Sequence, residues 1–137
     1  MKYRFVAISI IFFVTACTST KVSFKPAEDY LPNAQLNQYY SGVILANFNS
    51  NGELLPFSKR NSSVKITPVD SGLYSEPDFE NCSNADKSNK CGYHDYILIK
   101  GMPRKRGEVQ VEVTVRTPPN MYTKAGYFNK YYSIKIE

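Results

Sequence analysis

The stretch Val109-Gln110-Val111-Glu112-Val113-Thr114-Val115-Arg116 decides the fold of this chain. Valine alternates strictly with polar residues, and side chains along a β-strand point to opposite faces with a period of two. The four valines therefore share one face, and the polar side chains share the other. Because β-branched residues suit the pleated surface of a sheet, the stretch predicts a strand with one buried face and one face toward water.

Similar apolar segments, separated by turn residues, lie on both sides of this strand. Asn49–Gly52 predicts a tight turn because Asn and Gly tolerate positive φ, and Met102–Gly107 predicts a charged turn. Residues 70–92 are rich in Asp, Ser, Asn, Gly and Pro, and we expect a long loop there. Further strands are predicted over residues 43–48, 53–57, 63–67, 93–99 and 127–136.

Six or seven short strands in residues 41–137, without a helical stripe, predict an all-β domain and a small antiparallel β-sandwich. The architecture resembles immunoglobulin-like modules, and a transthyretin-like sandwich would give the same pattern. The chain has no Trp, and the spacing of its cysteines differs from that of the inter-sheet bridge in antibody domains. The resemblance therefore implies an architecture and no specific family.

The first residues have the pattern of an export signal. Lys2 and Arg4 precede an uncharged apolar run from Phe5 to Val14. A helix of about ten residues covers only half of the hydrocarbon layer of a bilayer, since it rises about 1.5 Å per residue. The run is too short for a transmembrane helix and has the length of a signal-peptide core.

Val14-Thr15-Ala16-Cys17 follows this run. An aliphatic residue, two small residues and a cysteine resemble the lipobox of bacterial lipoproteins. The resemblance implies cleavage before Cys17 and lipid attached to its sulfur, with acyl chains that hold the protein on a membrane. Thr18 stands where Asp would favour the inner membrane in enterobacterial lipoproteins, so we expect the outer membrane of a cell envelope.

The chain is thus expected to have three parts. Residues 1–16 are the signal peptide, residues 17–40 are the lipidated N-terminus with a flexible tether, and residues 41–137 are the sandwich. Pro26, Pro32 and small polar residues suggest the tether, within which residues 34–40 are compatible with a helical turn.

Charge excludes one class of partner. Without residues 1–16 the chain keeps 15 basic and 12 acidic residues, a net charge of about +3. This excess is too small for a nucleic-acid-binding protein, and export also argues against nucleic acid. Weak attraction to anionic lipid or glycan surfaces remains open.

If Cys17 carries the anchor, Cys82 and Cys91 are left as a pair in an oxidising compartment, where disulfides persist. We expect a Cys82–Cys91 disulfide within the long loop. A zinc site using both cysteines, His94 and Asp95 is the alternative, although paired ligand spacing is missing.

Candidate catalytic groups are few. His94 is the single histidine, and no G-x-S-x-G elbow accompanies it. Glu76, Asp78 and Glu80 alternate in the loop, either to bind calcium or to keep the loop solvated. We expect neither an enzyme nor a cofactor beyond the covalent lipid.

Two groups of residues are candidate contacts for a partner. Tyr122, Tyr127 and Tyr131 belong to a set of eleven tyrosines, and tyrosine is enriched at protein interfaces. Tyr131 and Tyr132 must point to opposite faces of one strand, so both cannot be core residues. Arg104, Lys105 and Arg106 form the densest basic cluster, suited to phosphate or acidic glycan, or to the solubility of a turn.

These patterns favour a lipid-anchored, non-enzymatic envelope module that binds another envelope protein or helps to assemble an envelope complex. Small sandwich lipoproteins similar in design occur in secretion systems, the type VI secretion lipoprotein among them, and no motif assigns this chain to that family. The alternative is a surface binder of glycan or lipid that uses residues 104–106 and nearby tyrosines. An enzyme that depends on His94 is a third hypothesis.

Overall fold

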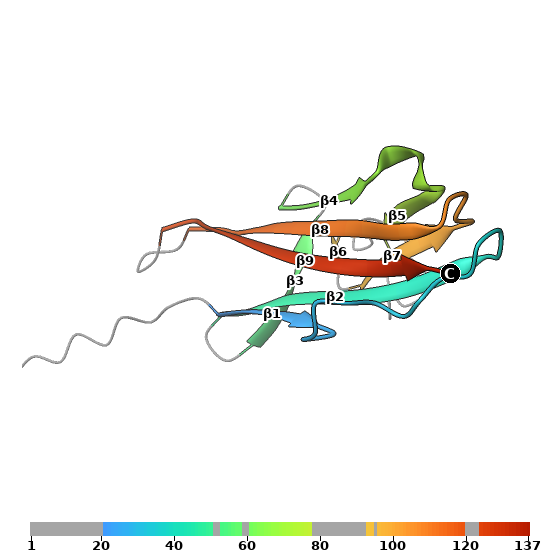
Figure 1. The fold of residues 1–137 in the computed structure, drawn as a ribbon. Helices are drawn as coiled ribbons and strands as arrows, with labels where there is room; N and C mark the ends of the chain where they lie inside the picture. The colour runs from blue at the N-terminus through green and yellow to red at the C-terminus, as the bar shows by residue number, and fades with distance from the viewer. Residues whose placement is uncertain (1–20, 51–52, 59–60, 78–92, 95, 120–123) are drawn as a thin grey trace, which may run out of the picture.

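The computed structural model describes residues 21–50, 53–58, 61–77, 93–94, 96–119 and 124–137 (Figure 1). Within these ranges the chain is almost entirely β, with one short 3-10 helix, η1. The elements are β1 (Lys21–Lys25), β2 (Tyr40–Ser50), β3 (Glu53–Ser58), β4 (Ser62–Thr67), η1 (Val69–Ser71), β5 (Leu73–Pro77), β6 (Tyr93–His94), β7 (Tyr96–Gly101), β8 (Gly107–Thr117) and β9 (Gly126–Ile136).

Two antiparallel sheets form the domain. The larger sheet has the order β5-β7-β2-β3-β6, with β1 paired to β2, and the smaller sheet has the order β4-β8-β9. Lys25 and Tyr96 both pair with Leu45, so β1 and β7 lie on opposite edges of β2. The sheets pack face to face in Figure 1. The predicted antiparallel β-sandwich is confirmed.

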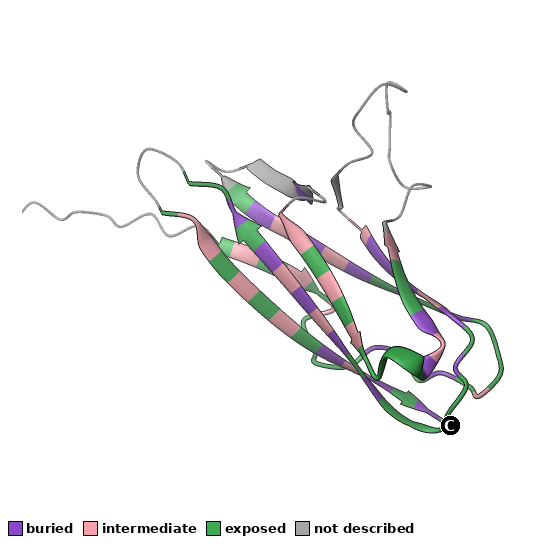
Figure 2. Cartoon of the chain, turned by 90° about the horizontal axis from the view of Figure 1, so that it is seen from above, coloured by how far each residue is buried: buried purple, intermediate pink, exposed green. Residues whose placement is uncertain are grey.

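The core lies between the sheets and follows the predicted alternation. The four valines of β8 are buried, and the polar residues between them are half-buried or exposed (Figure 2). β9 alternates in the same way over its last residues, so Tyr132, Ile134 and Ile136 face the core while Tyr131 is half-exposed. The opposite orientations predicted for Tyr131 and Tyr132 are thus confirmed.

Residues 21–40 belong to the sandwich, which corrects the tether expected over residues 17–40 for this part. Val22 and Phe24 of β1 pack against the core, and Leu31 and Ala34 are buried in it. The sequence did not predict these contacts, because the apolar residues stand singly among prolines and polar residues, at irregular spacing and without a period. The domain therefore includes residues 21–40 as well as residues from 41 onward.

The same segment crosses from one sheet to the other. After β1, residues 30 and 34 form isolated parallel bridges to Ser133 and Ile136 of β9. The turn suggested for residues 34–40 is not helical. Gln38 donates a backbone hydrogen bond of 3.2 Å to Gln35, but Asn37 between them has a positive φ of 59°.

The long loop expected over residues 70–92 is also only partly correct. Its first part contains η1 and β5, and β5 pairs with β7 from Leu73 to Pro77. Five residues with a single large aliphatic side chain gave no strand signal, so this edge strand depends on its pairing with β7. Among the described residues, no helix is long and apolar enough to span a bilayer.

Candidate protein-binding edge of β9

The outer edge of β9 is only half occupied. Ser133 donates its backbone N–H to Asp29 (2.8 Å) and accepts from Leu31 (2.9 Å), and Lys135 accepts from Ala34 (2.8 Å). The backbone polar groups of alternate residues point to the same edge of an antiparallel strand. The N–H and C=O groups of Tyr127, Asn129 and Tyr131 therefore point outward too. Within the described part of the chain, no strand pairs with residues 127–131 on this side, and we call this stretch the open edge.

Tyr127 begins the open edge. Its side chain is exposed, and the Arg116 guanidinium lies over the ring with its Cζ 5.5 Å from the centroid. The two residues are direct partners in the β8–β9 register. Such a cation–π contact orients an exposed ring. The Tyr127 ring is therefore fixed on the surface of the sheet, with the positive charge of Arg116 beside it.

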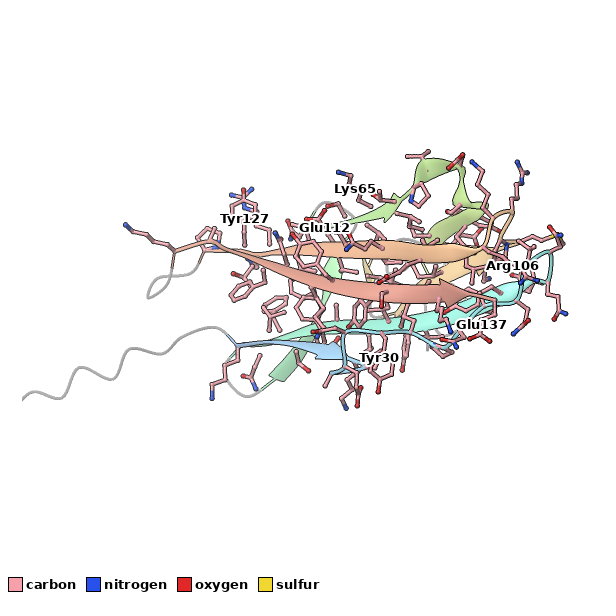
Figure 3. The ribbon with its side chains drawn as sticks, in the orientation of Figure 1. Tyr30, Lys65, Arg106, Glu112, Tyr127 and Glu137 are labelled. Carbon is pink, nitrogen blue, oxygen red and sulfur yellow. The ribbon has the colours of Figure 1, made fainter. Side chains whose placement is uncertain are left out.

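Tyr131 lies four residues further along on the same face. Its hydroxyl donates a hydrogen bond of 3.0 Å to Glu112 Oε1, and Glu112 is its register partner on β8. Half of its surface stays accessible. Figure 3 shows Tyr127 and Glu112 on the same side of the small sheet, with Lys65 of β4 beyond them. An aromatic group fixed before a partner arrives loses little conformational freedom on binding.

Lys130 closes one end of the open edge. Its ammonium forms an ion pair with Asp29 and donates to the carbonyl of Ala27 at 2.7 Å, while Nζ lies 5.4 Å from the centroid of the Tyr132 ring. An edge lysine commonly protects a strand from unwanted pairing. Here the charge is paired with Asp29, in the segment of residues 26–36 that crosses between the sheets (the crossing segment). It therefore does not protect the open edge from pairing.

Tyr132 holds the start of the crossing segment from the core side. Its hydroxyl donates to the carbonyl of Pro26 at 2.9 Å, and its ring is buried. Burial, with smaller contributions from the negative charges of Asp29 and Glu28, raises the pKa of Tyr132 to about 12. The phenol therefore stays neutral at physiological pH and acts as a structural donor.

A shallow hollow of about 410 Å³ adjoins the open edge, lined by Asn129, Lys130 and Tyr131 together with Asp29 and residues of β8. A second hollow of about 510 Å³ lies where residues 26–33 meet the start of β2, beside Tyr30 and Val43. The residues of the basic turn, 104–106, line neither hollow.

The basic turn lies far from the tyrosines. Arg104, Lys105 and Arg106 are all exposed, and the turn precedes Gly107, which pairs with Ile136. Tyr127 is nine residues from Ile136, or about 30 Å at the rise of a strand, and Figure 3 shows Tyr127 and Arg106 at opposite ends. The two predicted groups of contact residues therefore do not form one site.

The turn is fastened to η1. Arg104 donates its backbone N–H to Ser71 at 3.0 Å, and Lys105 forms an ion pair with Asp70. Hydrogen bonding and charge attraction from Lys105 lower the pKa of the Asp70 carboxyl. Part of the positive charge at this turn is thus balanced by its own neighbour.

Several predicted site residues lie outside the described residues, namely Cys17, Cys82, Cys91 and Tyr122. His94 is described only in its backbone, which pairs with Phe57. Glu76, proposed with Asp78 and Glu80 as an alternative calcium site, forms an ion pair of 3.5 Å with Lys100. Among the described residues, no three His, Cys, Asp or Glu side chains gather as a metal site.

Sequence reasoning found Tyr127 and Tyr131 but missed the open edge between them. Which edge of a sheet is covered depends on where residues 29–36 run, and that path leaves no periodic signal. The Tyr-x-x-x-Tyr spacing from 127 to 131 is a signal that would have placed both rings on one strand face.

Comparisons with known proteins give this chain no family. No protein-family model matches it, and no curated protein matches it. Among solved structures it is similar to the crystal structure of domains 4 and 5 of the S-layer protein SbsC, with a TM-score of 0.47 and 8% identity. The match covers 85% of this chain and 50% of that one. A similarity of this size assigns neither family nor function.

Proposed function

We propose that this protein is a lipid-anchored module of the bacterial cell envelope that docks a protein partner on the open edge of β9. The basic start, the apolar run and the Val14–Cys17 lipobox support the anchor. Among the described residues, no strand pairs with the N–H and C=O groups that point outward at Tyr127, Asn129 and Tyr131. This is the single observation on which the proposed docking depends most.

The edge suits the addition of a strand. An extended peptide can bind a free sheet edge through main-chain hydrogen bonds, while side chains on the strand give specificity. β9 already accepts the protein's own residues 30–36 further along the same edge. The open edge contains no proline, and the side chains of Tyr127, Asn129 and Tyr131 on the outer face of the sheet carry no charge. The open edge therefore lacks the usual protection against pairing.

The two tyrosines add a contact surface beside this edge. Aromatic residues are enriched at the centre of protein interfaces, and tyrosine is frequent among the residues that contribute most to affinity. Anchoring on a membrane raises the effective concentration of an envelope partner. A moderate affinity is therefore sufficient for assembly of an envelope complex, and the module needs no catalytic group.

Photo-crosslinking in living cells tests the docking. A photoreactive amino acid replaces Tyr131 in one variant and Tyr74 of β5 in a matched control. These two tyrosines have 50% and 48% of their surface exposed, on different sheets. We expect position 131 to give a crosslink to one defined protein and position 74 to give none.

A second variant tests strand addition. Asn129→Pro removes an outward N–H, and proline is tolerated where a strand's N–H faces away from its sheet. The adduct from position 131 should then disappear while the protein level is unchanged. Equal adducts from both positions, or an adduct indifferent to Asn129→Pro, would contradict docking on the open edge.

A glycan or anionic-lipid ligand at the basic turn is the alternative, favoured by the exposure of Arg104, Lys105 and Arg106. Such binding weakens steeply as salt rises, because it depends on exposed charges. Binding at the open edge depends mainly on uncharged groups, so it should change little as salt rises. Binding that is abolished by Arg104→Glu with Arg106→Glu, and is indifferent to Tyr131, would favour the alternative.

A further inference from the structure

The distance between the lipid and the domain is short. β1 begins at Lys21, four residues after Cys17. An extended chain covers at most about 3.6 Å per residue, so the Cα atoms of these residues lie within about 14 Å of each other. A tether that lasted to residue 40 would have allowed about 80 Å. A lipid at Cys17 therefore keeps this end of the domain at the bilayer surface.

The register identifies which end that is. Lys21 pairs with Asn49 at the far end of β2, and Thr117 pairs with Gly126 where β8 and β9 meet. Figures 1 and 2 both show the start of β1 and the tip of the β8–β9 pair at the same end of the molecule. We call it the anchor end. The turn at residues 104–106 lies at the other end, about 35 Å away along the eleven residues of β8.

The anchor end carries exposed positive charge. Lys21, Arg116 and Lys124 are exposed, and their positions on β1, on β8 and just before β9 surround this end. These three side chains give this end a positive charge. Basic residues near a membrane surface are attracted to anionic lipid within a Debye length of about 8 Å.

We infer that the anchor end lies against the anionic headgroups of the membrane, so that the sandwich stands end-on with the basic turn facing away. The inference rests on the proposed lipidation of Cys17. The exposed ring of Tyr127 lies beside Arg116 at the margin of this end. Tyr131, four residues further from the surface, stays available to a partner from the side.

Paramagnetic relaxation tests the orientation. The mature lipidated protein, isotope-labelled for NMR, is placed in nanodiscs of phosphatidylcholine and phosphatidylglycerol that contain a lipid with a gadolinium-chelating headgroup. We expect the amides of Lys21, Thr117 and Lys124 to broaden several-fold more than those of Gly107 and Glu137. Equal broadening at both ends, or stronger broadening at Gly107 and Glu137, would overturn the inference.

Charge variants test the contact with anionic lipid. Lys21→Glu with Lys124→Glu should reduce the contrast between the two ends at least twofold, whereas Arg104→Glu with Arg106→Glu is the matched control and should preserve it. An unchanged contrast in the first variant would overturn the electrostatic contact.

The intact mass of the same sample separates this inference from the proposed function. A protein without lipid on Cys17 contradicts the proposed function. A lipidated protein whose two ends relax equally contradicts the orientation alone.

Discussion

The backbone N–H of Leu31 donates a 2.9 Å hydrogen bond to the carbonyl of Ser133, a residue more than one hundred positions later in the chain. This contact joins the start of the domain to its last strand. Together with the bonds of Ala34 and Leu36 to Lys135 and Glu137, it covers the second half of the β9 edge; in the described part of the chain, no strand covers the first half. The same contact makes residues 29–31 part of the fold, so the lipid proposed at Cys17 would lie close to a rigid body.

Leu31 should therefore contribute to stability as a core residue. Its side chain is 2% exposed, and we expect Leu31→Ala to lower the free energy of unfolding by about 2–5 kcal/mol, through lost burial and a cavity. Urea denaturation of residues 18–137 measures this. Val69→Ala, at a position 90% exposed, is the control and should change the free energy by less than about 0.5 kcal/mol. Similar small effects for both would mean that residues 21–40 do not pack as described.

Gly42 leaves room for the ring of Tyr40 within the core. A Cβ at position 42 would lie 2.6 Å from the Tyr40 hydroxyl oxygen, so Gly42→Ala should cost about 1–3 kcal/mol by overpacking. The hydroxyl is buried without a hydrogen-bond partner among the described residues, and Tyr40→Phe alone should be close to neutral. In the double variant the cost should fall, with an interaction energy of about 0.5–3 kcal/mol. Additive effects in urea denaturation would rule out the close approach.

Alkaline pH should destabilise the domain through its buried phenols. Burial raises the pKa of Tyr40 to about 12, from 10.0 for an unperturbed tyrosine. Between these values the unfolded chain loses the Tyr40 proton while the folded chain retains it, so stability is fully present below about pH 10 and falls as pH rises toward 12. Tyr132 acts in the same direction.

The urea midpoint as a function of pH measures this effect. Tyr40→Phe should flatten the decline above pH 10 and leave the midpoint at pH 7 nearly unchanged. A decline of the same steepness in the variant would show that Tyr40 does not titrate with a raised pKa.

The pKa of Asp70 should depend on its ion pair with Lys105 of the basic turn. Lys105 lowers the pKa of this carboxyl below 3.8, first by hydrogen bonding and then by charge. Lys105→Met should return the pKa toward 3.8 in an NMR titration of the side-chain carboxyl. Arg106→Met, which removes another charge from the same turn, should have a smaller effect. If the two variants shift the pKa equally, the specific Lys105–Asp70 pair is absent.

The sequence predicted the sandwich because its longest strands are strictly periodic. Alternating valines at 109–115 and the pattern of 127–136 place each side chain on a face without knowledge of neighbours. β1 and β5 were missed because they are short, and β1 also carries two lysines. Their strand conformation comes from pairing with β2 and β7, which are distant in sequence.

The candidate site was predictable only in its side chains. Tyr127 and Tyr131 follow from the high tyrosine content, but the open edge depends on the course of residues 29–36 along Ser133 and Lys135. Separation of the basic turn from the tyrosines likewise depends on the register of β8 with β9. Three-dimensional pairing decided both, and single-sequence patterns do not contain it.

The state of one sulfur atom tests the account most directly. Intact-mass and peptide mass spectrometry of the protein extracted from its own cells determines the N-terminal residue and whatever is bonded to it. We predict a chain that begins at Cys17 and carries a thioether-linked diacylglycerol. A mature chain with a free thiol at that position, recovered in the aqueous fraction, would contradict the anchored function and the end-on orientation together.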